Sequence, residues 1–478
     1  MATRGYFAAG LLASALLLYA GPSQAVPSFA RQTKLPCNAC HTQFPELNSF
    51  GREFKLNGYV LRNIEGLESK TAKGRRDLDL PLIPMLSLMF ESSLTQTQRA
   101  ANGCTGGVAP PCDPATERLS RTQNGSIQFP QQFSLFWGGE ITDHIGAFGQ
   151  VTYSQNGGTF GIDNTDIRFA DHTEINEFPV VYGISLNNNP TVQDLWNSTP
   201  AWRFPYASSA VAPTPTAAPL ISGRLAQQVA GISAYALWND LVYAEVGAYR
   251  SAPQGVTGPL GGTNASNLIT NTAPYWRLAL QKQIENQYFM LGTFGIRASL
   301  LPGAGLSISD PANTFTDIGV DFNYQLTLDK NSITVHGAWI HEYQNYSNLF
   351  VTQGGAEHGS DSLDSFQLAA TYHLGTRWGF TIEPFMTFGS QDHCLYNGGC
   401  TPGTTTPMTL SSISGSQNGL PNNDGVTFEI DFNPWQNTRL ALQYVYYYDF
   451  NGAHSNYDGY GRNASYNNTI YLLAWFVY

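Results

Sequence analysis

From about residue 82 onwards the chain alternates between apolar and polar side chains with a period of two. In residues 318–326 the even positions are apolar and the odd positions are glycine or polar, and residues 426–432 repeat this pattern. Such alternation is typical of transmembrane strands that face lipid on one side and a wet lumen on the other. Aromatic residues make up 13% of the chain and charged residues only 12%, which agrees. We therefore predict an all-β fold, a transmembrane antiparallel β-barrel, with a secreted all-β enzyme as the alternative.

The connections between the alternating segments predict the number of strands. Seven short and eight longer connections give about sixteen strands, or fourteen if the weak segments near 160–171 and 178–187 are not strands. In outer-membrane barrels the short turns face the periplasm and the long loops face outward, at the cell surface. Residues 470–478 also support an outer-membrane barrel, because they form a strand whose apolar face ends on the aromatic Tyr478. We expect short turns at 142–144, 172–178, 239–240, 283–287, 328–331, 374–377 and 434–437, and long loops near 98–125, 156–163, 187–222, 252–273, 301–313, 346–362, 390–423 and 451–465.

The first 25 residues have the features of a secretory signal peptide. Arg4 is positively charged, residues 6–20 form a short apolar run, and residues 23–25 are a small-x-small cleavage site. No later stretch is apolar for the roughly twenty residues that a spanning helix requires. We divide the chain into a signal peptide (1–25), a small N-terminal segment (26–80) and a barrel (81–478), and expect the mature chain in the outer membrane, in contact with its lipid.

The N-terminal segment contains the motif C-x-x-C-H, formed by Cys37, Cys40 and His41. This spacing is the attachment site of a c-type haem, in which two thiols add to the vinyl groups and the adjacent histidine ligates the iron. The alternatives are a redox C-x-x-C of thioredoxin type and a chance disulfide. The first needs a βαβ context, and neither explains the histidine. We predict one covalent haem c, held by Cys37 and Cys40, with His41 as the proximal ligand of the haem iron.

A helix is predicted directly after this motif. Pro45 suits a first helical turn, Leu47, Phe50 and Phe54 recur on one face, and Gly58 is a plausible stop. We expect this face to pack against the haem, because so short a segment has little core of its own.

The charge of the chain is unevenly distributed. Residues 26–80 hold nine Lys or Arg and six Asp or Glu, a net charge of +3, whereas residues 81–478 carry −15. This difference favours a cytochrome segment that plugs the lumen from the periplasmic side. A periplasmic domain on a linker is the alternative. The alternation points five acidic side chains into the lumen: Glu140, Asp321, Glu383, Glu429 and Asp431.

The second axial ligand of the haem iron is not evident near the motif, because residues 42–84 contain neither His nor Met. Met85 and Met89 share the inward face of the first predicted strand, and His336 faces inward on another. These three are candidate distal ligands, and each could instead simply fill the lumen. A methionine ligand would raise the reduction potential of the haem.

The other four cysteines form two close pairs in Gly-, Pro- and Thr-rich segments. We predict the loop disulfides Cys104–Cys112 and Cys394–Cys400, as expected in an oxidising compartment. A metal site is the alternative, but His393 adjoins only one of the pairs.

Motifs of other enzyme classes are missing from the sequence. We find no G-x-G-x-x-G after a strand, no P-loop and no G-x-S-x-G. We assign no catalytic residue and expect no nucleic-acid partner. The hydrocarbon core of a bilayer is about 30 Å thick, too far for one tunnelling step, so a single haem could act as an electron conduit only from within the barrel.

The N-terminal segment resembles the fused outer-membrane cytochrome–porins, the monohaem ferrous-iron oxidases of iron-oxidising bacteria. The likeness lies in residues 27–33, 37–41, 44–55 and 58–59, and residues 187–202 also look like a loop of this family. The resemblance implies a haem segment followed by a sixteen-strand barrel. It also implies oxidation of extracellular Fe(II), with electrons passed to a periplasmic c-type cytochrome or another periplasmic electron carrier. The resemblance implies that Cys37, Cys40 and His41 are the haem residues, and it does not identify an Fe(II) site.

Three functional hypotheses follow from the sequence. The first is an outer-membrane iron oxidase. The second is an electron conduit for another donor or for an extracellular acceptor. The third is a diffusion porin whose haem segment is a structural plug.

Overall fold

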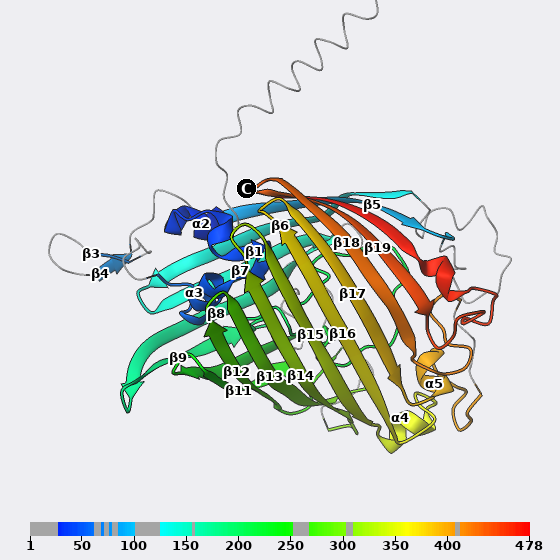
Figure 1. The fold of residues 1–478 in the computed structure, drawn as a ribbon. Coiled ribbons are helices and arrows are strands. Elements are labelled where there is room, and N and C mark those ends of the chain that lie inside the picture. The colour runs from blue at the N-terminus through cyan, green and yellow to red at the C-terminus, as the bar shows by residue number, and fades with distance from the viewer. Residues whose placement is uncertain are drawn as a thin grey trace, which may run out of the picture.

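The computed structural model describes residues 27–61, 68–70, 76–78, 85–100, 125–154, 158–251, 267–302, 309–406 and 412–478. Most of these residues form one closed antiparallel barrel of sixteen strands, in which β20 pairs with β5 to complete the ring (Figure 1). The prediction of sixteen strands is confirmed. The strands are β5 (Leu86–Thr97), β6 (Ser126–Thr142), β7 (Ile145–Ser154), β8 (Thr159–Ile175), β9 (Phe178–Asn187), β10 (Val229–Trp238), β11 (Val242–Ser251), β12 (Ala273–Ile284), β13 (Gln287–Leu300), β14 (Asn313–Thr327), β15 (Ser332–Asn345), β16 (Ser360–Leu374), β17 (Trp378–Gly389), β18 (Asn423–Trp435), β19 (Thr438–Asp449) and β20 (Thr469–Val477).

The barrel wall has the two-sided character that the alternation predicts. On β14, Ile318 and Val320 point outward and are 39% and 41% exposed, whereas Asp317 and Asp321 are fully buried on the lumen side. A closed barrel with an apolar outer face leaves no strand edge unpaired in lipid, which is the architecture of outer-membrane proteins. The five acidic residues predicted to point inward are all buried: Glu140, Asp321, Glu383, Glu429 and Asp431. Among the described residues, none of the helices is long and apolar enough to cross a bilayer.

The two ends of the barrel differ in their connections. Seven tight turns join consecutive strands at one end, and α4 (Asn348–Thr352) and α5 (His393–Tyr396) mark longer loops at the opposite end (Figure 1). By the usual rule the tight-turn end faces the periplasm. One predicted long loop, near 156–163, is wrong, because β8 already begins at Thr159 and pairs with β7.

The N-terminal segment lies at the tight-turn end of the barrel. It consists of α2 (Pro27–Thr33), the short 3-10 helix η1 (Cys37–Ala39), β1 (His41–Gln43), β2 (Glu46–Leu47) and α3 (Ser49–Leu56). A further small hairpin, β3 (Glu68–Lys70) and β4 (Arg76–Leu78), lies apart from the barrel wall (Figure 1). The predicted signal peptide lies outside the described residues.

Side chains of α3 fasten the segment inside the lumen. The Lys55 amine donates to the carbonyls of Val192 and Asp194 at 2.8 and 2.6 Å. Arg52 donates to Gln325 on β14 at 2.8 Å, with its guanidinium 3.8 Å from the centre of the Tyr288 ring. Lys55 and Arg52, which contribute to the net positive charge of this segment, therefore lie inside the barrel, where they contact amide oxygens and aromatic rings.

The predicted start of this helix at Pro45 is wrong. Pro45 lies in the turn between β1 and β2, and α3 begins only at Ser49. Asn48 is the N-cap, because its side-chain oxygen accepts a hydrogen bond from the Gly51 amide at 3.0 Å. Asn is among the best N-cap residues, and its capping bond outweighs the preference of Pro45 for a first turn. Phe50, which was predicted to face the haem, does not line the cavity described below, whereas Leu47 and Phe54 do.

The predicted outward-facing loop near 187–222 turns back into the lumen instead. We call the segment between β9 and β10, residues 188–228, the inner loop. Val192, Trp196 and Leu220 are almost fully buried there. The Arg168 guanidinium donates to the Gln193 carbonyl at 2.8 Å, which satisfies backbone that would otherwise be buried without a partner. Apolar side chains and satisfied carbonyls together explain why this loop is stable inside the barrel.

A buried ion triad joins the inner loop to the wall. The Arg277 guanidinium lies 3.0 Å from Asp194 of the loop and 2.8 Å from Asp321 of β14, and all three side chains are buried. We expect Arg277→Ala to destabilise the barrel by about 3–5 kcal/mol, because it leaves two buried carboxylates without their cation. The temperature at which the folded band converts to the unfolded band on heat-modifiability gels measures this loss. Arg297→Ala removes an exposed arginine from the same strand-pair region, and an equal shift in both variants would contradict the expectation.

Candidate haem site

Cys37, Cys40 and His41 lie where the N-terminal segment meets the tight turns between the strands. The Cys37 amide donates to the Gln436 side chain at 3.4 Å, in the turn between β18 and β19. The two motif thiols are not joined in a disulfide. Burial raises the pKa of the Cys40 thiol to about 11, so this sulfur stays protonated in the absence of a covalent partner.

Two residues of the α3 start hold the motif in place. The Asn48 side-chain amide donates to the carbonyl of Ala39 at 3.0 Å, and its backbone amide donates to the Cys40 carbonyl at 2.9 Å. Gly51 lies so close to Cys40 that a Cβ at this position would come within 2.2 Å of the Cys40 carbonyl oxygen. The helix and the motif therefore form one packed unit.

The ring of His41 is suited to be a metal ligand. Burial lowers its pKa to about 4, so the imidazole is neutral at physiological pH. Backbone groups of Pro45 and Glu46 lie within hydrogen-bonding reach of the ring, and the ring borders the cavity described below. A metal-ligating histidine is commonly oriented by such a contact at one ring nitrogen while the other nitrogen binds the metal, so this ring fits the role of an iron ligand.

A cavity of about 360 Å³ opens beside the motif and is bordered by all three of its residues. Its walls are largely apolar and aromatic, as expected of a site for a large flat cofactor. The N-terminal segment, the barrel wall and the inner loop each contribute a side. The apolar lining includes Phe29, Leu47, Phe54, Phe136, Phe148, Trp202 and Trp475.

The three candidate distal ligands occupy different places. Met89, on β5, lines the cavity and is 3% exposed. Met85 lies just before β5 and packs against Gly139, outside the cavity lining. His336 is buried in the lumen near Glu46 and His373, and also lies outside the lining. Of the three, the structure brings only Met89 to the cavity that the C-x-x-C-H motif borders.

The inner loop adds residues to the cavity that the sequence did not single out as site residues. Asn197, Trp202, Arg203 and Tyr206 line it from the side of the lumen. The tryptophans in residues 196–202 were the available signal, since paired aromatic residues are unusual in an exposed loop.

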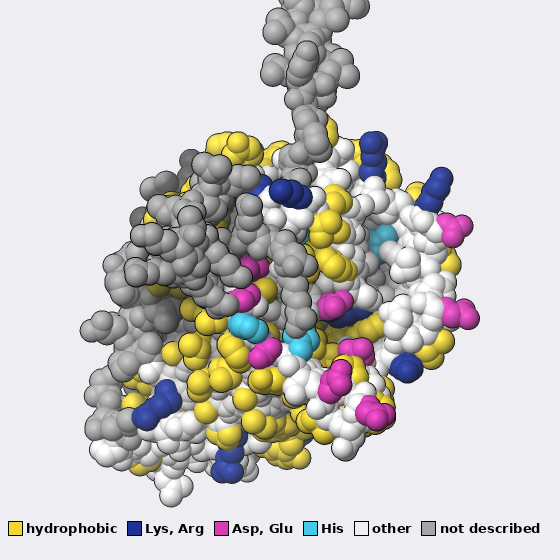
Figure 2. All heavy atoms as spheres, turned by 90° about the vertical axis from the view of Figure 1, so that its left-hand side faces the viewer, with side chains coloured by type: hydrophobic (Ala, Val, Ile, Leu, Met, Phe, Trp, Pro, Cys, Tyr) yellow, Lys and Arg dark blue, Asp and Glu magenta, His cyan; other side chains and the backbone are white. Residues whose placement is uncertain are grey.

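The end of the barrel around the motif carries both acidic and basic side chains. Figure 2 shows this face, with acidic side chains and histidines scattered among hydrophobic ones and basic side chains mostly towards its edge. Glu174 and Glu177 are exposed at the β8–β9 turn, and Lys330 and Arg377 at other turns. A second cavity of about 230 Å³, bordered by Cys37, His41 and Trp435, connects the motif with this face.

One of the two predicted disulfides lies in a long loop at the opposite end of the barrel. Cys394 and Cys400 are joined, as predicted. The pair Cys104 and Cys112 lies outside the described residues.

Comparisons with known proteins find relatives in structure alone. No protein-family model and no curated protein matches the chain. Similar solved structures include the outer-membrane channel DcaP of Acinetobacter baumannii (11% identity, 82% of this chain and 96% of that chain, TM-score 0.44). The loop L8 deletion mutant of OmpT from Vibrio cholerae (10%, 82% and 98%, 0.42) and an anion-selective porin from Comamonas acidovorans (10%, 82% and 98%, 0.41) are also similar. At such identities the likeness is one of fold, and function must be inferred from the residues of this chain.

Proposed function

We propose that the protein is an outer-membrane c-type cytochrome that oxidises extracellular Fe(II) and delivers single electrons to a periplasmic electron carrier. The observation that carries this proposal is the C-x-x-C-H motif beside a mostly apolar cavity inside the barrel. Haem c bound there supplies a one-electron redox centre. The choice of Fe(II) rests on the resemblance of the N-terminal segment to the cytochrome–porins.

The residues around the cavity are suited to this task. Phe136, Phe148, Trp202 and Trp475 give the cavity apolar aromatic walls, which would favour the binding of a large flat cofactor. Cys37 lies beside the periplasmic turns, so a soluble partner can approach the motif from that end. The mixed charges of that end offer pairing positions for such a partner.

The test is anaerobic stopped-flow mixing of the purified, oxidised protein with Fe(II). We expect the haem absorption bands to convert to those of the reduced form. Mn(II) at the same concentration is the matched control, because it is a divalent cation of similar coordination chemistry and a much weaker reductant. Complete absence of reduction by Fe(II) in a haem-loaded protein would overturn the assignment of substrate.

The haem midpoint potential is a separate test between an iron oxidase and a conduit for another redox partner. A potential below that of the Fe(III)/Fe(II) couple under the working conditions would favour a different donor, or electron flow to an extracellular acceptor. A potential that permits Fe(II) oxidation would favour the first assignment.

A diffusion porin with a structural haem plug is the second candidate. Barrels of sixteen to eighteen strands are wide enough to leave an aqueous channel, and this barrel has sixteen. The inner loop and α3 occupy much of the lumen, which opposes solute passage. Swelling of proteoliposomes in sugar solutions tests this candidate, and swelling at the rate of an open porin would favour it.

Met89 is our choice for the distal ligand among the three candidates. We expect Met89→Leu to keep the covalent haem and to lower its reduction potential, because a thioether ligand raises the potential. Spectroelectrochemical titration measures the shift. Met85→Leu, a matched change outside the cavity lining, should leave the potential unchanged. A potential unaffected by Met89→Leu would show that the sulfur of Met89 is not a ligand.

A further inference from the structure

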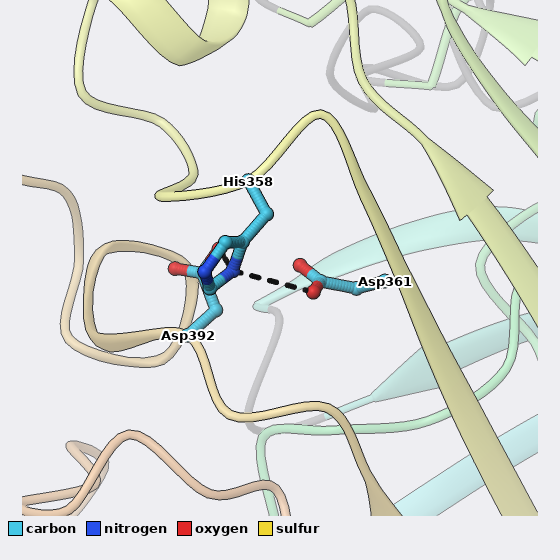
Figure 3. A group of neighbouring side chains, drawn as sticks. All are labelled: His358, Asp361 and Asp392. Carbon is cyan, nitrogen blue, oxygen red and sulfur yellow. Dashed lines mark ion pairs between the residues drawn. The ribbon is translucent and has the colours of Figure 1, made fainter.

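Three side chains of metal-binding type meet at the outer end of the barrel, far along the chain from the haem motif. His358 precedes β16, Asp361 is its second residue, and Asp392 precedes α5. Figure 3 shows them pointing toward one another, His358 and Asp361 from the start of β16 and Asp392 from the segment before α5. One ligand atom from each lies within 4.8 Å of the other two.

The distances within this group are those of ligands around an ion. The His358 Nδ1 atom lies 3.6 Å from an oxygen of Asp361 and 3.8 Å from an oxygen of Asp392. Both distances are too long for a hydrogen bond. Metal bonds of about 2.0–2.2 Å to imidazole and carboxylate place adjacent ligand atoms roughly 3–3.6 Å apart, so small adjustments would bring all three onto one ion.

A second observation points to a missing ligand. The Asp361 side chain is 3% exposed, no N–H or hydroxyl of the described residues donates to its Oδ2 atom, and the group that faces it is the second carboxyl, Asp392. Burying such an oxygen without a partner is costly. A bound cation would satisfy it and would also offset the repulsion between the two buried carboxylates.

The protein holds Asp392 in position. One oxygen of this carboxylate accepts from the Leu395 amide at 2.7 Å as the N-cap of α5, and the other accepts from the Glu357 amide at 2.7 Å. The Cys394–Cys400 disulfide braces the same loop. His358 itself is 55% exposed on its side chain, so an ion can enter from the outside.

We propose that His358, Asp361 and Asp392 form a site for a divalent first-row transition-metal ion on the outer face. One imidazole nitrogen with two carboxylate oxygens favours such an ion over Mg²⁺ or Ca²⁺, which prefer oxygen ligands alone. The remaining coordination positions face solvent and hold water. By joining two residues at the start of β16 to one just before α5, the ion ties two outer segments of the chain together. This site is independent of the haem and goes beyond the proposed function.

Metal binding to the purified full-length protein tests the proposal, with Co(II) as the probe because it stays divalent in air. Equilibrium dialysis followed by metal analysis should find one Co(II) per chain that competes with Zn(II) but not with Mg(II). We expect His358→Ala and Asp361→Asn each to weaken this binding at least about tenfold, because each removes a ligand. Asp392 is left unchanged, since its replacement would also remove the cap of α5.

Matched controls come from other outer loops. His454→Ala removes another exposed histidine, and Asp310→Asn another acidic residue, and both should bind Co(II) like the original protein. Saturating Co(II) should raise the unfolding temperature of the original protein and not that of His358→Ala. Absence of stoichiometric Co(II) binding, or equal binding by the original protein and a folded His358→Ala variant, would overturn the site. Neither result depends on haem reduction by Fe(II).

Discussion

The double variant Cys37→Ser/Cys40→Ser will contain no covalent haem. Both thioether bonds require a thiol, and a hydroxyl does not add to the haem vinyl groups. The mass of the mature protein should fall by one haem, and the haem stain of denaturing gels should be lost completely. The barrel should still assemble, because Lys55 and Arg52 bind the lumen through partners that lie outside the motif.

The matched control is Cys394→Ser/Cys400→Ser, which removes the same number of sulfurs from the outer loop. This variant should keep its full complement of haem. Haem retained through denaturation in the motif variant, or lost equally in both variants, would contradict covalent attachment at Cys37 and Cys40.

The barrel could be predicted because its signal is local and repeated. Each strand carries its own alternation, as Ile318, Val320 and Asp321 illustrate on β14, and an antiparallel barrel pairs neighbours in the chain. The number of strands and the lumen-facing acids followed from this pattern. Where the alternation was weak, in β8 and β9, the strands form because both neighbouring strands supply hydrogen-bond partners.

The path of the inner loop could not be predicted, because its cause is non-local. Its composition, rich in Pro, Ala, Ser and Thr, is that of an exposed loop, and only the folded barrel places Arg168 and Lys55 beside the carbonyls of residues 192–194. The same limit applies to the distal ligand. Met89 and His336 both point inward, and the sequence does not say how deep in the lumen each one lies.

The start of α3 shows a conflict between two local rules. Pro45 favours a first helical turn and Asn48 favours an N-cap three residues later. The structure follows Asn48, because its backbone amide also bonds to the Cys40 carbonyl and so joins the helix to the motif. Tertiary contact with the motif therefore selects between two starts that the sequence alone allows.

The close packing of α3 against the motif leads to the second large prediction. We expect Gly51→Ala to reduce greatly the amount of haem-loaded protein. The added Cβ would lie 2.2 Å from the Cys40 carbonyl oxygen and 3.0 Å from a methyl carbon of Leu47. The backbone oxygen cannot rotate away, so α3 must move off the motif. Overpacking of this kind costs about 1–3 kcal/mol, and here it displaces the wall of the cavity.

The ratio of haem to protein in the purified variant measures the effect, and the remaining haem should be extracted or bleached more readily than in the original protein. Gly359→Ala is the control, because no atom lies within 4 Å of a Cβ built at that position. It should leave the haem content unchanged. A Gly51→Ala protein with full haem content and the original stability would show that α3 and the C-x-x-C-H motif need not pack this closely. The haem cavity would then be defined by the barrel wall and the inner loop, and α3 would serve chiefly to fasten the segment in the lumen through Arg52 and Lys55.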